Sequence, residues 1–295
     1  MKKVAVIGSG TMGNGIAHTF AQYGFEVSLI DINNEALQRG LKTISTNLDK
    51  QVKKEVLTEA DKTDILNRIT TFIDLKTGVT GVGLVIEAAT ENQEIKLDIF
   101  KQLSDICGNE TILATNTSSI SISQIASVTN RPENVIGMHF MNPVPLMKLV
   151  EVIKGKNTSA QTIQTIMQLS RQLEKIPVEV NDAPGFVANR ILMPMINEAI
   201  FTLYEGVSGV GEIDTVMKLG MAHPMGPLQL ADFIGLDVCL AIMNVLYDGF
   251  KTDKYAPCPL LIDLVNAKQL GIKTGSGFYK YTPGSKDMVV ADRFV

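Results

Sequence analysis

Short apolar runs alternate with amphipathic stretches along the first half of the chain. Val4–Ile7 is an uninterrupted apolar run, as expected for a strand buried on both faces of a parallel sheet. Further runs of this kind lie at residues 27–30, 84–86, 111–114 and 135–138, and helical periodicity fills the stretches between them. Strands and helices in alternation predict βαβ crossovers, and therefore an α/β fold with a doubly wound sheet.

One connection in this half is longer than a crossover needs. Residues 35–69 are charged and favour helix, and they include Lys50, Lys53 and Lys54. This pattern predicts a helical arm that projects from the sheet. The alternative is an ordinary pair of solvated surface helices, which is the usual meaning of a run of charges.

The composition changes after Asn181, where Ala183-Pro184-Gly185 breaks the chain. Long stretches with apolar periodicity follow at residues 186–205, 228–246 and 260–270, and Pro194 predicts a kink or short break in the first. We therefore expect a first domain of residues 1–182 and an all-helical second domain of residues 183–295. The apolar content of the second domain predicts a homodimer or higher oligomer built through it. The aperiodic tail, Thr282–Val295, is expected to be loosely held.

Composition narrows the class of partner. The 295 residues carry 27 Lys and Arg against 31 Asp and Glu, a net charge of −4, so no basic surface is available for nucleic acid or an anionic membrane. No stretch has the pattern of a signal peptide or a membrane span. The three cysteines form no CxxC pair and the three histidines are dispersed. We therefore expect reduced thiols in a cytoplasmic protein, and no metal site.

A glycine-rich turn directly after the first strand predicts dinucleotide binding. Residues 8–13, the phosphate-binding turn, fit GxGxxG and open a helix. Gly8 allows the tight turn, Gly10 lets a pyrophosphate approach, and Gly13 allows the helix to pack on the strand. Together with the helix N-terminus, they make Gly8, Gly10, Thr11, Met12 and Gly13 candidate cofactor contacts in a Rossmann-type domain.

An acidic residue at the end of the second strand selects between the two nicotinamide cofactors. Asp31 lies 18 positions after Gly13, where a carboxylate accepts hydrogen bonds from the adenosine ribose and repels a 2′-phosphate. The residues that follow it, Ile32-Asn33-Asn34, include no arginine. The sequence therefore favours NAD over NADP, with a helix or turn cap as the structural alternative for Asp31.

The best candidate for proton transfer is a histidine at the end of a later strand. His139 is followed by Asn142-Pro143-Val144-Pro145, which must turn the chain, and then by a returning apolar strand in which Glu151 is the single charge. A hairpin-like return would bring the carboxylate beside the ring. A carboxylate there fixes the imidazole tautomer and stabilises the imidazolium. The structural alternative is that Glu151 lies on an exposed strand face.

The segment from His139 to Val152 resembles the signature of the L-3-hydroxyacyl-CoA dehydrogenase family. The resemblance covers nearly the whole chain, and a freestanding chain of this length is similar to the bacterial branch that acts on 3-hydroxybutyryl groups. The other motifs that carry it, in order, are the phosphate-binding turn, Glu87-Ala88, Asn116-Thr117-Ser118-Ser119, residues 184–190 and residues 273–279.

The resemblance implies an NAD-dependent oxidoreductase that interconverts (S)-3-hydroxybutyryl-CoA and acetoacetyl-CoA. It implies that His139 is the general acid–base, that Glu151 orients it, and that Ser118 and Asn189 bind substrate oxygens. The further cofactor contacts that it implies are Ala89, Glu91, Lys96, Asn116, Ser118, Asn142 and Lys273. The phosphates of coenzyme A need cations near the cleft, for which Lys50 and Lys54 of the arm are candidates.

Three other functions remain open at this point. Tyr247 and Lys251 have the Tyr-x-x-x-Lys spacing of short-chain dehydrogenases, but the pattern lies in the helical domain and spans Gly249. Related β-hydroxyacid dehydrogenases act on free acids with a catalytic lysine. A non-catalytic NAD-binding protein could share the fold, although it would have no need of a proton-transfer pair.

Overall fold

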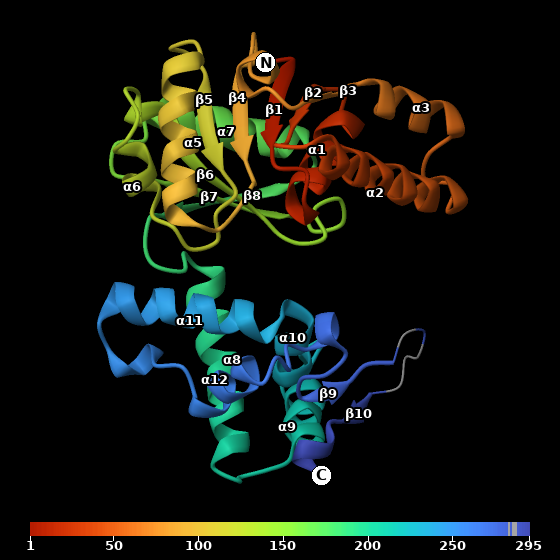
Figure 1. The fold of residues 1–295 in the computed structure, drawn as a ribbon, viewed down its shortest axis with the longest axis vertical. Helices are drawn as coiled ribbons and strands as arrows, with labels where there is room; N and C mark the ends of the chain where they lie inside the picture. The colour runs from red at the N-terminus through yellow and green to blue at the C-terminus, as the bar shows by residue number, and fades with distance from the viewer. Residues whose placement is uncertain (283, 285–287) are drawn as a thin grey trace. The chain divides into compact units, whose positions relative to one another are not determined.

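The first unit of the chain, Met1–Ala183, is built on one eight-stranded sheet (Figure 1). The computed structural model describes residues 1–282, 284 and 288–295. The strands are ordered β3-β2-β1-β4-β5-β6-β7-β8, and every neighbouring pair is parallel except β6–β7. Their bounds are β1 Lys3–Ile7, β2 Glu26–Ile30, β3 Ile69–Phe72, β4 Leu84–Glu87, β5 Ile112–Thr115, β6 Val135–Phe140, β7 Leu149–Lys154 and β8 Ile176–Asn181.

Helices pack on this sheet and enclose its central strands. Val4, Ala5 and Val6 of β1 are completely buried, as an apolar run predicts for a strand covered on both faces. The predicted doubly wound α/β sheet is therefore confirmed. The helices of the unit are α1 Thr11–Gln22, α2 Asn34–Lys53, α3 Glu59–Asn67, α4 Leu75–Gly78, α5 Gln93–Ile106, α6 Ile122–Ala126, α7 Ala160–Gln172 and the 3₁₀ turn η1 Pro132–Asn134.

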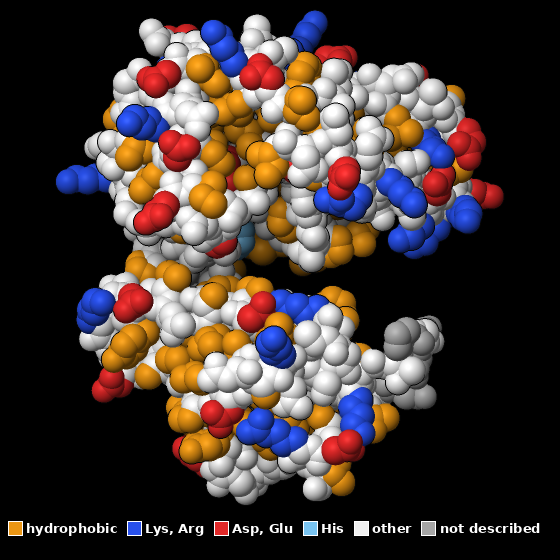
Figure 2. Space-filling model, viewed as in Figure 1, with side chains coloured by type: hydrophobic (Ala, Val, Ile, Leu, Met, Phe, Trp, Pro, Cys, Tyr) orange, Lys and Arg blue, Asp and Glu red, His pale blue; other side chains and the backbone are white. Residues whose placement is uncertain are grey.

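Helices α2 and α3 form the predicted arm. Leu37, Ile44 and Leu48 bury one face of α2, and the opposite face is charged. Thr58 starts α3 with a capping box, in which its side chain accepts from the Asp61 amide while Asp61 accepts from the Thr58 amide. Figure 2 shows the Lys and Arg side chains of this region interspersed with acidic ones. The arm lysines, Lys50, Lys53 and Lys54, are exposed.

One strand of the sheet was not predicted. Residues 69–72 form β3, an edge strand that pairs with β2, although the sequence places the end of the arm at residue 69. The strand has four residues, two of them threonines, and only Ile69 is buried. Because an edge strand needs little apolar surface, its pattern does not stand out from the polar arm before it.

The second unit, Pro184–Val295, is mainly helical (Figure 1). This agrees with the predicted all-helical domain except for the two-stranded sheet of β9 (Tyr279–Lys280) and β10 (Val289–Val290). Helix α8 continues through Pro194, so of the kink or short break predicted there, the break is absent. The stretch predicted as one helix over residues 228–246 is two helices, because Gly235 adopts φ +104° and turns the chain by 98°. The principal helices are α8 Ala188–Tyr204, α9 Val210–Thr215, the π-helical turn η2 Val216–Gly220, α10 Pro227–Ile234, α11 Leu236–Phe250 and α12 Pro259–Asn266.

The described part of the C-terminal tail is anchored rather than loosely held, which corrects the prediction. Strand β10 (Val289–Val290) pairs with β9 (Tyr279–Lys280), and the Ala291 amide donates to the Phe278 carbonyl over 3.0 Å. Ala291 is buried. The remainder of the prediction, on residues 283 and 285–287, lies outside the described residues. Two smaller 3₁₀ turns precede this region, η3 Asp253–Tyr255 and η4 Ile272–Thr274, and η5 Asp292–Phe294 ends it.

Within the described residues, no single helix is both long and apolar enough to cross a membrane. Helices α10 and α11 meet the length and composition criteria only as a pair bent by 98°.

Candidate active site

His139 and Glu151 lie side by side on the antiparallel pair of strands β6 and β7. The two residues are direct partners in the ladder, and Nδ1 of the ring is 2.8 Å from the Glu151 carboxylate Oε2. The side chains are 11% and 3% exposed. The contact that the sequence predicts is therefore present, and the alternative of an exposed strand face for Glu151 is wrong. With Nδ1 bonded to the carboxylate, the ring presents Nε2 as the nitrogen for a reacting oxygen.

A buried lysine anchors the loop between these strands, residues 141–148. Lys175, 7% exposed, donates through Nζ to the carbonyl of Val144 over 2.6 Å and to that of Met147 over 2.9 Å. Burial lowers the pKa of Lys175. On its other side Val144 packs against Gly15 of α1, where an added Cβ would lie 3.0 Å from the valine Cβ. Val144 therefore joins the loop to the helix that starts at the phosphate-binding turn.

A second buried histidine lies on the same helix. His18 is fully buried, its Nε2 is 3.3 Å from Nε2 of Gln51, and its Nδ1 has no hydrogen-bond partner among the described residues. Burial lowers the pKa of His18 to about 4. The ring is therefore neutral at pH 7, and its unprotonated Nε2 can accept a hydrogen bond from the side-chain amide of Gln51.

The glycines of the phosphate-binding turn fit a dinucleotide. Gly8 has φ +93°, and a Cβ there would lie 2.6 Å from Ala88 O and from Ala89 Cα. A Cβ on Gly13 would lie 1.8 Å from the Gly8 carbonyl oxygen, so only glycine lets the helix approach the strand. At Gly10 a Cβ would meet nothing within 4 Å, which leaves the space a pyrophosphate needs against the backbone. Thr11 and Met12 begin α1, whose N-terminus favours anions.

Asp31 lies beside this turn. Its Oδ2 accepts from both the amide and the hydroxyl of Ser9 over 2.7 Å, and its Oδ1 accepts from the Ile32 amide. The carboxylate is partly exposed, so it both caps the turn and faces solvent. The structural role proposed as the alternative for Asp31 is thus present, and it leaves the exposed side of the carboxylate available to a ribose.

Glu91 accepts hydrogen bonds from the polar residues that follow strand β5. Its Oε1 accepts from the Thr117 hydroxyl at 2.8 Å, the Ser118 amide at 2.7 Å, and the hydroxyls of Ser118 and Ser119 at 2.9 Å each. Burial opposes ionisation of Glu91, but the nearby Lys96 and these hydrogen bonds outweigh it and lower its pKa. The Ser118 hydroxyl therefore donates to Glu91 in this structure.

Lys96 is buried, so its ammonium is not exposed for direct contact with the cofactor. It is 1% exposed, and Nζ donates to Glu87 over 2.5 Å and to the Thr115 hydroxyl over 3.4 Å. Glu91 is 3.7 Å away. A buried ammonium needs such partners because it has lost its water. The sequence motif located the residue but did not reveal the buried acid, Glu87, that engages it.

Two asparagines flank the histidine strand. The Asn116 side chain accepts from the Phe140 amide over 2.9 Å, which ties the end of β5 to the residue next to His139. Asn142 is exposed and precedes a cis proline, Pro143. Both are placed at the carboxyl ends of the strands, where ligands of doubly wound sheets bind.

The remaining candidates belong to the second unit. Asn189 is buried near the start of α8. Lys273, in η4, forms an ion pair with Asp237 of α11 and approaches Gly235 so closely that a Cβ there would lie 2.7 Å from its Nζ. Tyr247 lies in the last turn of α11, and Lys251 is its C-cap with left-handed backbone geometry. Among the described elements, the pair is therefore not next to a strand, as the catalytic pair of a short-chain dehydrogenase would be.

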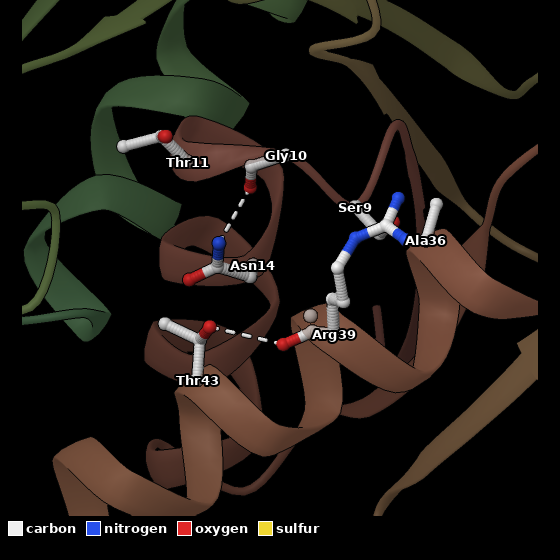
Figure 3. Close-up of a pocket in the computed structure, with 8 residues that line it drawn as sticks. Ser9, Gly10, Thr11, Asn14, Ala36, Arg39 and Thr43 are labelled. Carbon is white, nitrogen blue, oxygen red and sulfur yellow. Dashed lines mark hydrogen bonds between the residues drawn. The ribbon is translucent and has the colours of Figure 1, made fainter. Parts of the chain in front are cut away.

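A polar cavity of about 210 Å³ adjoins the phosphate-binding turn (Figure 3). Ser9, Gly10 and Thr11 line one wall, and Arg39 and Thr43 of α2 line the other. The sequence did not point to Arg39, because this residue lies outside the phosphate-binding turn and is not adjacent to Asp31. The helix places this arginine beside the turn although eight positions separate it from Asp31.

Comparisons with known proteins match both units. The 3-hydroxyacyl-CoA dehydrogenase NAD binding domain matches residues 3–183, and the C-terminal domain of the same enzymes matches residues 185–281. This chain belongs to the 3-hydroxyacyl-CoA dehydrogenase family. The predicted family membership is confirmed, and so are the predictions of an oxidoreductase and of NAD as its cofactor.

Relatives within the 3-hydroxyacyl-CoA dehydrogenase family are similar over their whole length. A probable 3-hydroxybutyryl-CoA dehydrogenase of Bacillus subtilis is 54% identical over 95% of this chain and 98% of its own. The 3-hydroxybutyryl-CoA dehydrogenase of Clostridioides difficile is 54% identical over 95% and 99%. The crystal structure of (S)-3-hydroxybutyryl-CoA dehydrogenase from Ralstonia eutropha, 50% identical, covers 96% of this chain and 99% of its own with a TM-score of 0.93.

Proposed function

We propose that this enzyme interconverts (S)-3-hydroxybutyryl-CoA and acetoacetyl-CoA with NAD, using His139 as the acid–base group. The observation that carries the proposal is the buried 2.8 Å contact between His139 and Glu151, at the end of the sheet where ligands bind. Similarity to dehydrogenases named for the four-carbon substrate supports the acyl length.

Residues of this chain transfer the proton and hydrogen-bond the substrate oxygen. In oxidation, Nε2 of His139 takes the hydroxyl proton, and Glu151 stabilises the imidazolium that results. In reduction, the protonated ring donates to the carbonyl oxygen, where negative charge develops. Ser118, once released from Glu91, supplies a second donor to that oxygen, and Asn189 is a further candidate contact to the substrate.

NAD, when bound, supplies the hydride chemistry. The residues that would hold it are the phosphate-binding turn for the pyrophosphate and Asp31 for the adenosine ribose. At the nicotinamide end we propose Asn142 and Asn116, with Ala89, Glu91 and Lys273 as further contacts. Lys96 would act through Glu91 rather than by touching the cofactor, since its ammonium is already buried against Glu87.

Oxidation of NADH with acetoacetyl-CoA tests the proposal directly. His139→Ala should reduce kcat at least about a hundredfold, the usual scale of general acid–base catalysis. His223→Ala, which removes the partly exposed histidine of the second unit, is the matched control and should retain activity. Activity on free acetoacetate equal to that on the thioester would refute the coenzyme A assignment and favour a β-hydroxyacid dehydrogenase.

We further propose that Lys50 and Lys54 of the arm bind phosphates of coenzyme A. They are exposed and lie close together in sequence at the end of the arm helix, Lys50 in the last turn of α2 and Lys54 at its C-cap. Replacing both with alanine should raise KM for acetoacetyl-CoA with little change in kcat. An unchanged KM would contradict this role, and Lys42→Ala on the same helix is the control.

The assembly and location of the enzyme are also proposals. Large apolar side chains of the second unit are exposed, among them Ile191, Leu219 and Phe233, which supports a homodimer or higher oligomer through this unit. Light scattering on the purified protein measures its mass in solution, and a monomer would refute the assembly. The three cysteines are free and buried, in keeping with the reducing cytoplasm; cell fractionation tests this placement.

A further inference from the structure

The cavity beside the phosphate-binding turn has features that NAD alone does not need. It lies between the N-terminal end of α1 and the first three turns of α2, and eight described residues line it. Among those eight, Arg39 is the one with a charged side chain. In Figure 3 its guanidinium is directed along the cavity toward Ser9 and Ala36, and away from Thr43.

Ser9 connects this cavity to the position proposed for the adenosine ribose. Its amide and hydroxyl both donate to Asp31, and the same residue lines the cavity on the side that Arg39 faces. A ribose bound to Asp31 would therefore place its 2′ substituent next to Ser9 and the mouth of the cavity. In Rossmann-type sites, an arginine near the acidic residue accommodates a 2′-phosphate.

Arg39 is available for such a ligand. Its side chain is 71% exposed, and its ion-pair partner, Glu35, is 3.8 Å away and 90% exposed. An exposed pair at this separation contributes little and is readily exchanged for a better partner. A phosphate is such a partner, because the guanidinium is permanently charged and binds phosphate oxygens through two parallel hydrogen bonds.

We propose that Arg39 is a specificity-determining residue which gives the cofactor site a second, weaker capacity for dinucleotides that carry a 2′-phosphate. Asp31 repels that phosphate and keeps NAD the preferred cofactor, while Arg39 offsets part of the repulsion. This inference rests on the proposed placement of the ribose at Asp31. It makes the preference between NADH and NADPH a balance between two side chains rather than the effect of one acid.

The test compares the two cofactors in the Arg39→Gln variant. With saturating acetoacetyl-CoA, the ratio of kcat/KM for NADPH to that for NADH should fall at least about tenfold, since the loss of even one charge-assisted hydrogen bond has this effect. The matched control is Lys42→Gln, which removes another exposed cation from α2 that does not line the cavity, and it should leave the ratio within twofold. Circular dichroism melting curves verify that each variant is folded.

A binding measurement makes the inference independent of turnover. Inhibition constants against NADH are measured for 2′,5′-ADP and for 5′-ADP, which differs in lacking the 2′-phosphate. In Arg39→Gln the constant for 2′,5′-ADP should rise about tenfold and that for 5′-ADP by less than threefold. If the enzyme proved inactive with acetoacetyl-CoA, the proposed function would fail, yet direct titration with these two nucleotides would still decide the role of Arg39.

Three results would overturn the inference. The first is a cofactor ratio that changes less than twofold. The second is an equal loss with both cofactors, which would place Arg39 on the pyrophosphate that they share. The third is a wild-type protein that binds 2′,5′-ADP no more tightly than the Arg39→Gln variant does.

Discussion

Replacing Glu151 with glutamine tests the acid–base pair without removing the imidazole. Glutamine keeps the size of the side chain and can still hydrogen-bond Nδ1, but it carries no charge. In reduction His139 must be protonated before it donates, so the variant loses the anion that stabilises this form. The rate of acetoacetyl-CoA reduction should fall, and it should fall most at high pH.

The geometry bounds the size of the effect. Unit charges 2.8 Å apart attract by about 6 kcal/mol at an effective dielectric constant of 20, which is a ceiling because the variant retains a dipole there. Hydrogen bonds to charged groups contribute about 1.5–3 kcal/mol net. We therefore expect kcat to fall by roughly 10- to 150-fold.

The assay is the pH dependence of NADH oxidation with acetoacetyl-CoA from pH 5 to 9. Glu179→Gln is the matched control, since it makes the same change on the neighbouring strand β8 at an exposed ion pair with Lys154. A loss smaller than threefold in Glu151→Gln would refute the reasoning. So would a fall in rate that is equal at pH 5 and at pH 9, because that pattern indicates a purely structural role.

Three further predictions concern groups around the site. In the folded protein His18 has a pKa of about 4, against an ordinary 6.5. The free energy of unfolding should therefore be undiminished above pH 6.5 and should fall by about 3 kcal/mol as the pH falls from 6.5 to 4. In urea titrations, His18→Asn should show a smaller dependence of this free energy on pH. Lys96→Met leaves the Glu87 carboxylate buried without its cation, which should lower the free energy of unfolding by about 3–5 kcal/mol in urea titrations. Lys175→Met should lower kcat more than it raises KM for NADH, because the loop at Val144 loses its anchor, and Lys175→Arg should restore part of the rate; equal effects on both constants would contradict a positioning role.

The sequence predicted those parts of the fold that depend on continuous apolar runs. Strand β1 and the Glu151 strand are examples, since each buries an unbroken or nearly unbroken set of apolar side chains. The sequence did not predict β3, whose pairing depends on backbone hydrogen bonds and not on its side chains. It also did not predict the turn at Gly235, because apolar periodicity continues on both sides of that residue.

The candidate site divides in the same way. His139 and Glu151 were predictable because Glu151 is the single charge in an apolar strand that returns beside the strand of His139. The partners of Lys96 and Lys175 were not, since Glu87 lies nine positions from the first, and Val144 lies 31 positions from the second. Arg39 shows a third case, in which helical geometry brings a residue to a cavity although no motif includes it.

The antiparallel pairing of β6 with β7 has a consequence for how this enzyme tolerates insertions and deletions. Side chains alternate between the two faces of a strand, so a slip of one residue in β7 would carry Glu151 to the opposite face from His139. The intervening loop, residues 141–148, carries no such alternation. An insertion or deletion of one residue within either strand should therefore abolish activity, and the spacing from each strand end to its acid or imidazole should stay invariant among active relatives.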